Sequence, residues 1–211
     1  MTVETTPLAG CPCGDPNGPL CPDCLAYETQ KSHEKFMARL QVSSLPEALQ
    51  DFHIAEAVPG PAADAASAWA RGELGGLCLT GDVGVGKSWL AAAATWERLQ
   101  THGVRWVPAA RLMTELRSGF NSKAKEQADQ IITSRGAIVL DDLDKVNPTE
   151  YGREVMFAVI DGRIEAGAPL LVTTNAAISE IALRLGDPIA SRLAGYCQVV
   201  RMTGRDRRLA K

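Results

Sequence analysis

The sequence lacks the features that would place a protein in a membrane or on an export route. Its first residues, MTVETTPLAG, have neither the basic leader nor the apolar core of a signal peptide. No apolar run approaches the roughly 20 residues that a membrane-spanning helix needs. We therefore expect a cytoplasmic protein, in a compartment where thiols stay reduced.

An excess of positive charge is also missing. The net charge is −3, so the surface as a whole does not attract nucleic acid, and a DNA site would have to be a local basic patch. Apolar residues make up 45 % of the chain, as in an ordinary globular protein. A length of 211 residues allows one medium domain with a small appendage.

Disulfides are not expected in a reducing compartment, so the six cysteines need another explanation. Cys78 and Cys197 lie in predicted strands, and we interpret both as small buried apolar residues.

The remaining four cysteines form a C-x-C…C-x-x-C cluster made of Cys11, Cys13, Cys21 and Cys24. Four thiolates at this spacing favour a tetrahedral structural zinc ion. Zinc would contribute roughly 10–16 kcal/mol, far more than so short a segment gains from burial. His33 is a substitute ligand, and a disulfide pair or unliganded thiols are the alternatives.

The N-terminal part of the chain divides into two predicted segments. The cysteine cluster and an exposed helix over residues 25–41 form a zinc-binding partner module, residues 1–45. Residues 46–61 are rich in proline without long periodicity, which predicts a linker. Residues 62–211 form the remaining core.

The core contains a glycine-rich loop, Gly81-x-x-x-x-Gly86-Lys87-Ser88, which fits the phosphate-binding P-loop. A predicted strand ends at Thr80 and a predicted helix follows, so backbone N–H groups and the helix dipole would face the phosphates. Lys87 would reach the β- and γ-phosphates, and Ser88 would hold Mg²⁺. The alternative is a chance glycine loop with a solvated lysine. The predicted nucleotide-binding residues are Gly81, Asp82, Val83, Gly84, Val85, Gly86, Lys87, Ser88 and Trp89.

Apolar runs alternate with longer helical patterns along the rest of the core. The predicted strands after the P-loop strand are Val104–Pro108, Ala137–Leu140, Pro169–Thr174 and Cys197–Met202. The predicted helices are Ala62–Arg71, Trp89–Gln100, Ala109–Arg117, Lys123–Ser134 and Tyr151–Ala166. Such alternation predicts an α/β fold, with a parallel sheet covered by helices on both faces.

Polar residues follow two of these strands. The strand at residues 137–140 runs into Asp141 and Asp142, which fits a Walker B pattern. Asp141 would serve the Mg²⁺ shell, and Asp142 would be the general base for the attacking water. Asp144 is interpreted as a loop charge. Asn175 ends the next strand and would sense the γ-phosphate and the water. The alternatives are a plain acidic turn and a simple strand cap.

Four segments together resemble the AAA+ ATPases of the DnaC/IstB type: GDVGVGKS, AIVLDDLDK, PLLVTTN, and RLGDPIASRL followed by GRDRR. The resemblance covers about Leu45 to Arg208 and implies a P-loop NTPase (ASCE/AAA+) sheet without a C-terminal lid. It implies that Asn175 is sensor 1 and that Arg192 is an arginine finger acting on ATP in the adjacent subunit. Arg184 is the substitute finger.

No residue is assigned to sensor 2, the second nucleotide-sensing position of this family, because the helical lid that would carry it is not expected. The candidates are Arg205, Arg207 and Arg208, which equally suit DNA phosphates.

The resemblance implies an ATPase, slow and stimulated by DNA or a partner, in one of two roles. The first is a loader that delivers the hexameric replicative helicase to single-stranded DNA and self-assembles with ATP. The second is an IstB-like helper of a DNA transposase. A P-loop kinase for a small molecule and a zinc adaptor with a degenerate ATPase are less well matched, because no acceptor site is found and every key position is filled.

Contact with single-stranded DNA would need cationic groups along a groove. The predicted DNA-binding residues are Arg117, Lys123 and Lys125, which lie on or between the helices after the second strand. The alternative is an ordinary solvated charged face.

Overall fold

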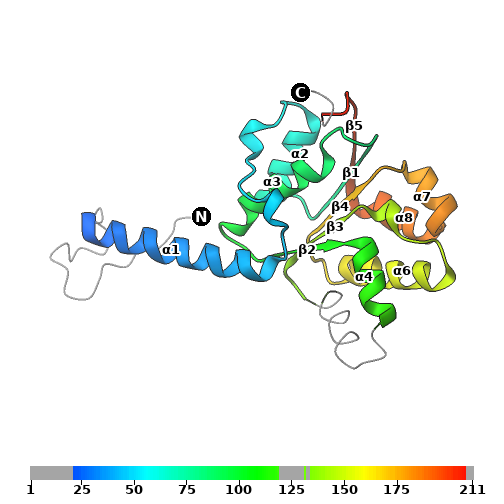
Figure 1. Ribbon diagram of the computed structural model, residues 1–211, viewed down its shortest axis with the longest axis horizontal. Coiled ribbons are helices and arrows are strands. Elements are labelled where there is room, and N and C mark those ends of the chain that lie inside the picture. The colour runs from blue at the N-terminus through cyan, green and yellow to red at the C-terminus, as the bar shows by residue number, and fades with distance from the viewer. Residues whose placement is uncertain (1–20, 119–130, 132–133, 208–211) are drawn as a thin grey trace.

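A five-stranded parallel sheet forms the centre of the protein in the computed structural model (Figure 1), which describes residues 21–118, 131 and 134–207. Its order is β2-β3-β4-β1-β5, and every neighbouring pair is parallel. The strands are β1 (Gly76–Gly81), β2 (Val104–Pro108), β3 (Ala137–Asp141), β4 (Leu170–Thr174) and β5 (Cys197–Met202). The predicted α/β fold is confirmed.

Helices connect these strands. They are α1 (Pro22–Ser43), α2 (Pro61–Arg71), α3 (Lys87–Leu99), α4 (Ala109–Ser118), α6 (Glu150–Glu165), α7 (Ile178–Leu185) and α8 (Asp187–Tyr196). Three short 3₁₀ turns are η1 (Glu47–Leu49), η2 (Ile54–Glu56) and η3 (Leu143–Lys145). Each predicted core element that falls within the described residues is present, with ends that differ by no more than two residues. The predicted helix at 123–134 lies almost wholly outside the described residues.

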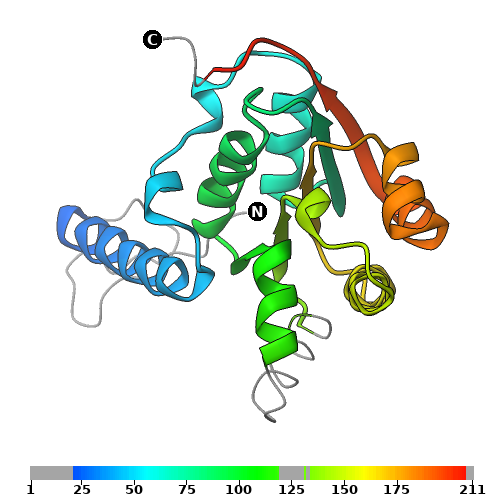
Figure 2. The ribbon, with the colours of Figure 1, turned by 45° about the vertical axis from the view of Figure 1, so that its right-hand side comes forward.

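The sheet separates two apolar layers, as a parallel sheet with crossover helices requires. One layer packs Leu77, Leu79 and Val139 of the strands against α2 and α3. The other packs Ile138 and Val172 against α4, α6, α7 and α8. Figure 2 shows α2 and α3 on one side of the sheet, with α6, α7 and α8 on the other. Helices therefore pack against both faces of the sheet.

The segment predicted as a linker packs against the core. Ile54 is buried in the layer that holds α2 and α3, and Leu49 and Phe52 are partly buried against it. The backbone N–H of Ile54 donates to Glu97 Oε1 at 3.1 Å. Residues 46–61 are therefore an ordered strap along α3, because their apolar side chains find partners that the proline content did not reveal.

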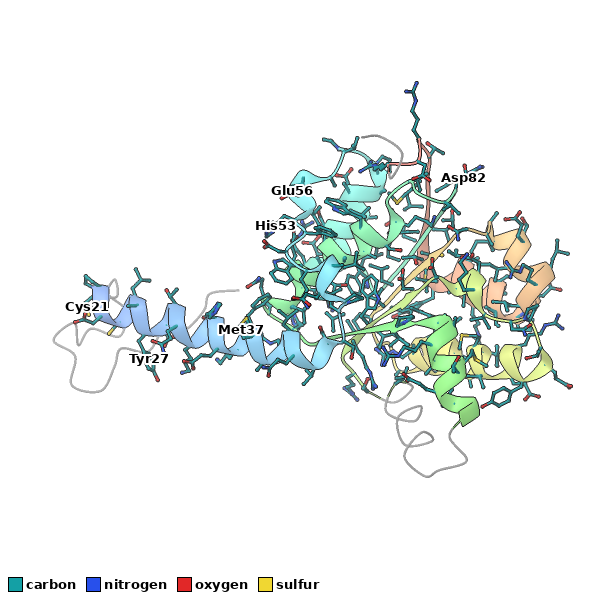
Figure 3. All side chains as sticks on the ribbon, viewed as in Figure 1. Cys21, Tyr27, Met37, His53, Glu56 and Asp82 are labelled. Carbon is teal, nitrogen blue, oxygen red and sulfur yellow. The ribbon has the colours of Figure 1, made fainter. Side chains whose placement is uncertain are left out.

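The end of α1 also docks on the core. Phe36 meets Trp96 edge to face, with ring centroids 4.9 Å apart, and Arg39 donates to the carbonyl oxygens of Leu99 and Gln100. The first half of α1, which carries Cys21 and Tyr27, projects away from the sheet (Figure 3). Whether residues 1–45 act as a separate module stays a prediction.

Among the described residues, no helix is both long enough and apolar enough to cross a membrane.

Candidate nucleotide-binding site

The predicted P-loop joins β1 to α3. The strand ends at Gly81 and the helix begins at Lys87, so the intervening turn opens directly onto a helix N-terminus. Gly86 adopts φ 100°, a left-handed conformation that glycine takes without the steric cost of a side chain. The first N–H groups of α3 have no partner within the helix, which suits them to an anion.

Lys87 lies at the centre of this turn and is only 5 % exposed. Its ammonium group donates to the carbonyl oxygens of Gly81 and Asp82 and to Asn175 Oδ1, each at 2.8 Å. The turn and the end of β4 thus hold the lysine side chain at the mouth of the site, where phosphates would meet it.

Ser88 and Asp141 meet beside the lysine. Ser88 Oγ donates to Asp141 Oδ1 at 3.0 Å, and Thr173 Oγ1 donates to the same oxygen at 2.6 Å. Burial raises the pKa of Asp141, and these two hydrogen bonds partly oppose that rise. A hydroxyl and a carboxylate in contact are oxygen ligands that suit Mg²⁺, so the donor set fits the predicted metal.

Asp142 follows in a left-handed conformation, φ 55° and ψ 53°, which only a few per cent of non-glycine residues adopt. Its backbone N–H donates to Thr173 Oγ1 at 2.9 Å. The Asp142 side chain lines the central cavity of the site, which is described in the next paragraph. The position suits the predicted general base.

These groups surround a cavity of about 540 Å³, which is large enough for a nucleotide. Lys87, Ser88, Asp142 and Asn175 line its polar side. The apolar side comes from the strap, the P-loop turn and α3. It is lined by Leu49, Phe52, Val83 and Trp89.

Sequence reasoning missed the contribution of the strap to this cavity. Phe52 lies against Trp89, with ring centroids 5.5 Å apart and planes inclined by 32°. The only sequence signal was the lone aromatic residue in the segment 46–61. Trp89 was predicted to bind nucleotide, and the structure places it beside the cavity.

The interpretation of Asp144 as a loop charge is wrong. Its side chain is 8 % exposed. Asp144 Oδ1 accepts from the backbone N–H of Asn175 at 2.7 Å, and Oδ2 accepts from Asn175 Nδ2 at 2.8 Å. Burial raises the pKa of Asp144, but these hydrogen bonds outweigh that effect and the pKa is lowered. The turn η3 brings Asp144 back to the end of β4, which residue spacing alone did not indicate.

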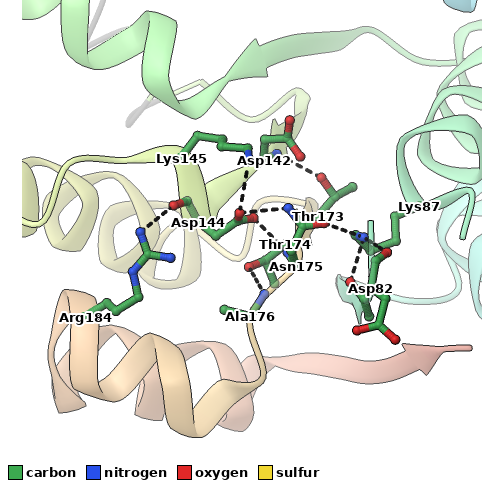
Figure 4. A network of polar contacts seen from close by, with 11 residues as sticks. Asp82, Lys87, Asp142, Asp144, Lys145, Thr173, Thr174, Asn175, Ala176 and Arg184 are labelled. Carbon is green, nitrogen blue, oxygen red and sulfur yellow. Dashed lines mark hydrogen bonds and ion pairs between the residues drawn. The ribbon is translucent and has the colours of Figure 1, made fainter. Parts of the chain in front are cut away.

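The two candidate finger arginines have different surroundings. Arg184 Nη2 donates to the carbonyl oxygen of Asp144 at 2.8 Å, within the network around Asn175 (Figure 4). Arg192 is 48 % exposed, and its Nε lies 2.7 Å from Asp161 Oδ1 of α6. Arg192 is not among the residues that line the central cavity. Both arginines are exposed, so they differ in their partners: Arg184 contacts the network around Asn175, and Arg192 contacts α6.

The segment after β5 crosses the P-loop. The backbone N–H of Arg207 donates to Gly84 O at 3.0 Å, and Arg207 lines the central cavity. Gly84 is needed here, because a Cβ at that position would lie 2.0 Å from Asp206 Oδ1. Of the three arginines considered for sensor 2, Arg207 is the one at the cavity; Arg205 is exposed, and Arg208 lies outside the described residues.

The structure gives little information on the predicted DNA-binding residues. Lys123 and Lys125 lie outside the described residues, and of Arg117 only its place near the end of α4 is described.

Two of the four cysteines in the predicted zinc cluster lie within the described residues. Cys11 and Cys13 lie outside the described residues. Cys21 is the N-cap of α1, and Cys24 is 1 % exposed in its first turn. Within the part of the chain that the structure describes, no group of three or more His, Cys, Asp or Glu side chains has metal-binding geometry.

The fold and the site together define a P-loop nucleotide-binding protein with a parallel five-stranded sheet. Residues 28–211 match the family of IstB-like ATP binding proteins, and the chain belongs to that family. Comparison with curated proteins gives no match.

Solved structures share the fold at low sequence identity. A DnaI structure is 22 % identical with a TM-score of 0.65, covering 78 % of this chain and 94 % of that one. The DnaC helicase loader is 20 % identical with a TM-score of 0.64, covering 75 % and 100 %. The replication initiator DnaA, bound to AMPPCP and single-stranded DNA, is 16 % identical with a TM-score of 0.65, covering 74 % and 51 %. These similarities establish the fold alone.

Proposed function

We propose that this protein is an ATP-dependent helicase loader, which binds ATP and single-stranded DNA and delivers the hexameric replicative helicase to DNA during initiation. The observation that carries the ATPase part is the convergence of Lys87, Ser88 and Asn175 around one cavity, with Asp141 hydrogen-bonded to Ser88. Membership of an ATP-binding family supports it. The loader role rests on the fold shared with DnaC, described as a helicase loader.

In the proposed reaction each group has one task. Lys87 would exchange its carbonyl partners for the β- and γ-phosphates. Ser88 and Asp141 would hold Mg²⁺, which would supply positive charge beside the phosphates. Asp142 accepts the proton of the attacking water. We expect slow hydrolysis, because aspartate reaches less far than the glutamate found in many related ATPases.

The base of the nucleotide would lie between the strap and α3. Phe52 and Trp89 offer an apolar, aromatic surface in the lining of the cavity, which suits a purine. Arg207 is our candidate for sensor 2, since its side chain lines the same cavity.

Arg192 is proposed as the arginine finger for the ATP of an adjacent copy. Its exposure, and its absence from the described lining of the cavity in its own chain, support action between subunits. Arg192→Ala should leave ATP binding unchanged and lower DNA-stimulated hydrolysis by roughly 10³-fold. Arg184→Ala is the comparison, and hydrolysis by Arg192→Ala at the wild-type rate would exclude the finger.

The alternative is an IstB-like helper of a DNA transposase, which the family name favours. A pull-down of the full chain with the hexameric helicase of its host, with and without ATP, separates the two roles. A loader binds the helicase, whereas a transposition helper binds duplex DNA and a transposase instead.

The N-terminal part would supply the partner contact. Leu25 and Tyr27 are 58 % and 46 % exposed on the projecting half of α1. Replacing both with glutamate should abolish helicase capture without changing ATP hydrolysis. Val42→Glu is the matched control, because Val42 is 73 % exposed at the docked end of the same helix.

We also propose that a structural zinc ion is held by Cys11, Cys13, Cys21 and Cys24. The burial of Cys24 and the position of Cys21 at the start of α1 support the C-x-x-C half, since a helix N-terminus favours thiolates. Elemental analysis of the purified protein should find one zinc per chain, and Cys24→Ser should lose it.

DNA contact is proposed for Arg117, Lys123 and Lys125, which follow one another between the second and third strands of the sequence. Replacing all three with glutamine should weaken binding of single-stranded DNA and reduce its salt dependence. Arg111→Gln serves as a control, because Arg111 already pairs with Glu115 at 2.7 Å on the surface of α4.

A further inference from the structure

Asn175 lies between two groups of opposite charge. It follows β4, the strand between β1 and β3, so it faces the P-loop on one side and η3 on the other. Lys87 Nζ is 2.8 Å from Asn175 Oδ1, and Asp144 Oδ2 is 2.8 Å from Asn175 Nδ2 (Figure 4). The side-chain amide thus bridges the lysine and the carboxylate.

Only one orientation of this amide satisfies both neighbours. An ammonium group can only donate hydrogen bonds, and an ionised carboxylate can only accept them. The lowered pKa of Asp144 keeps that carboxylate ionised at neutral pH. The oxygen of Asn175 must therefore face Lys87, and its NH₂ group must face Asp144.

Asp144 is itself held in place independently of Lys87. Its backbone carbonyl oxygen accepts from Arg184 Nη2 at 2.8 Å, and Lys145 Nζ lies 3.9 Å from its Oδ2. The backbone N–H of Asn175 anchors the other carboxylate oxygen at 2.7 Å. When phosphates draw Lys87 away, Asp144 remains in contact with the amide.

We propose that Asp144 is a positioning residue that fixes the amide of Asn175 with its oxygen toward the nucleotide, so that Asn175 orients the attacking water as an acceptor. The inference rests on the proposed ATPase function. Phosphate oxygens are acceptors and gain nothing from a second acceptor, whereas a water molecule donates readily to Oδ1. Asp142 then receives the proton of that water as it attacks the γ-phosphorus and ADP leaves.

Asp144→Asn tests this role with little change in shape. The new amide can donate to Asn175 Oδ1, so the Asn175 amide turns over and presents its NH₂ group to the γ-phosphate. We expect kcat for ATP hydrolysis to fall about 10- to 100-fold. KM and the dissociation constant for ATP should stay the same or decrease, because a donor now faces the phosphate.

Glu180→Gln is the matched control. Glu180 and Asp144 both line a second cavity beside Asn175. The Glu180 carboxylate accepts from the backbone N–H of Ala177 at 2.6 Å. This carboxylate-to-amide change should leave both kcat and KM unchanged. Asp144→Ser is a second variant, which keeps an acceptor for the backbone of Asn175 without specifying the amide, and it should show the same fall in kcat.

The outcomes separate this inference from the proposed function. Wild-type kcat in both Asp144 variants, alongside low kcat in Asn175→Ala, would overturn the positioning role and leave the ATPase intact. A rise in KM with a lower melting temperature, and no separate fall in kcat, would show a merely structural role and also overturn it. If the wild-type protein neither binds nor hydrolyses ATP, the proposed function fails, and this inference fails with it.

Discussion

Lys87 and Arg163 are both buried cations, but they serve opposite ends of the sheet. Lys87 is 5 % exposed at the carboxyl ends of the strands, and Arg163 is 0 % exposed near their amino ends. Both are surrounded by carbonyl oxygens, as a buried charge requires. The comparison separates a cation that awaits a ligand from one that is part of the fold.

Arg163 is a clamp between chain segments. From α6 its guanidinium donates to the carbonyl oxygens of Ile131, Ser134, Gly136 and Pro169, and so joins the entrances of β3 and β4. Burial lowers its pKa to about 10, so the group stays charged at neutral pH. It is absent from the lining of the central cavity.

Lys87 differs because its partners are exchangeable. The carbonyl oxygens of Gly81 and Asp82 belong to the turn that would also surround phosphates, and a further acceptor is the Asn175 amide. A triphosphate could replace these acceptors without breaking an apolar layer. Burial alone therefore does not indicate a site; burial beside a cavity, with replaceable partners, does.

The largest predicted effect is that of Lys87→Ala on nucleotide affinity. The variant loses the charge-assisted contacts with the β- and γ-phosphates, each contributing about 1.5–3 kcal/mol. ATP should bind more than about 100-fold more weakly, while the melting temperature without ATP changes little. Titration with fluorescent ATP measures the affinity, and thermal unfolding measures the melting temperature. An unchanged ATP affinity would show that Lys87 is not a ligand-binding cation.

Arg163→Met should show the opposite pattern. Its loss leaves buried carbonyl oxygens without a donor, which should cost about 3 kcal/mol and lower the melting temperature by roughly 6–12 °C. ATP affinity below the transition should stay within about twofold. Calorimetric unfolding measures the first effect, and a large loss of ATP affinity in the folded variant would show that the two ends are coupled.

Phe52→Ala tests whether the strap contributes to ATP binding. It removes the aromatic surface beside Trp89 and should weaken ATP binding about tenfold through lost apolar contact. Binding of inorganic triphosphate should not change, because that ligand has no base. Equal weakening of both ligands would place Phe52 in a purely structural role.

Asp141→Asn should have the smallest effect on the protein without nucleotide, and it should stabilise it. Burial raises the pKa of Asp141, so the protonated form favours the fold and the ionised form opposes it. That opposition grows as pH rises through the raised pKa and vanishes in acid. The variant should therefore melt about 1–2 °C higher at neutral pH, with the gain lost in acid and no further gain from Mg²⁺·ATP.

Patterns local in the sequence predicted most of the fold and half of the site. The P-loop, Asp141 and Asn175 follow apolar strands at recognisable positions, so their meeting at one sheet edge could be predicted. Asp144 could not be predicted, because its role depends on how a short 3₁₀ turn returns toward β4. The sequence also did not predict the place of Phe52, because its position beside the cavity depends on how the strap packs against α3.

Calorimetric titration of the wild-type full chain with ATP in the presence of Mg²⁺ tests the central claim most directly. The account predicts saturable binding of one ATP per chain, lost in Lys87→Ala and retained in Arg163→Met at a temperature where that variant is folded. No heat of binding from a folded wild-type protein, or equal binding by the Lys87 variant, would contradict it.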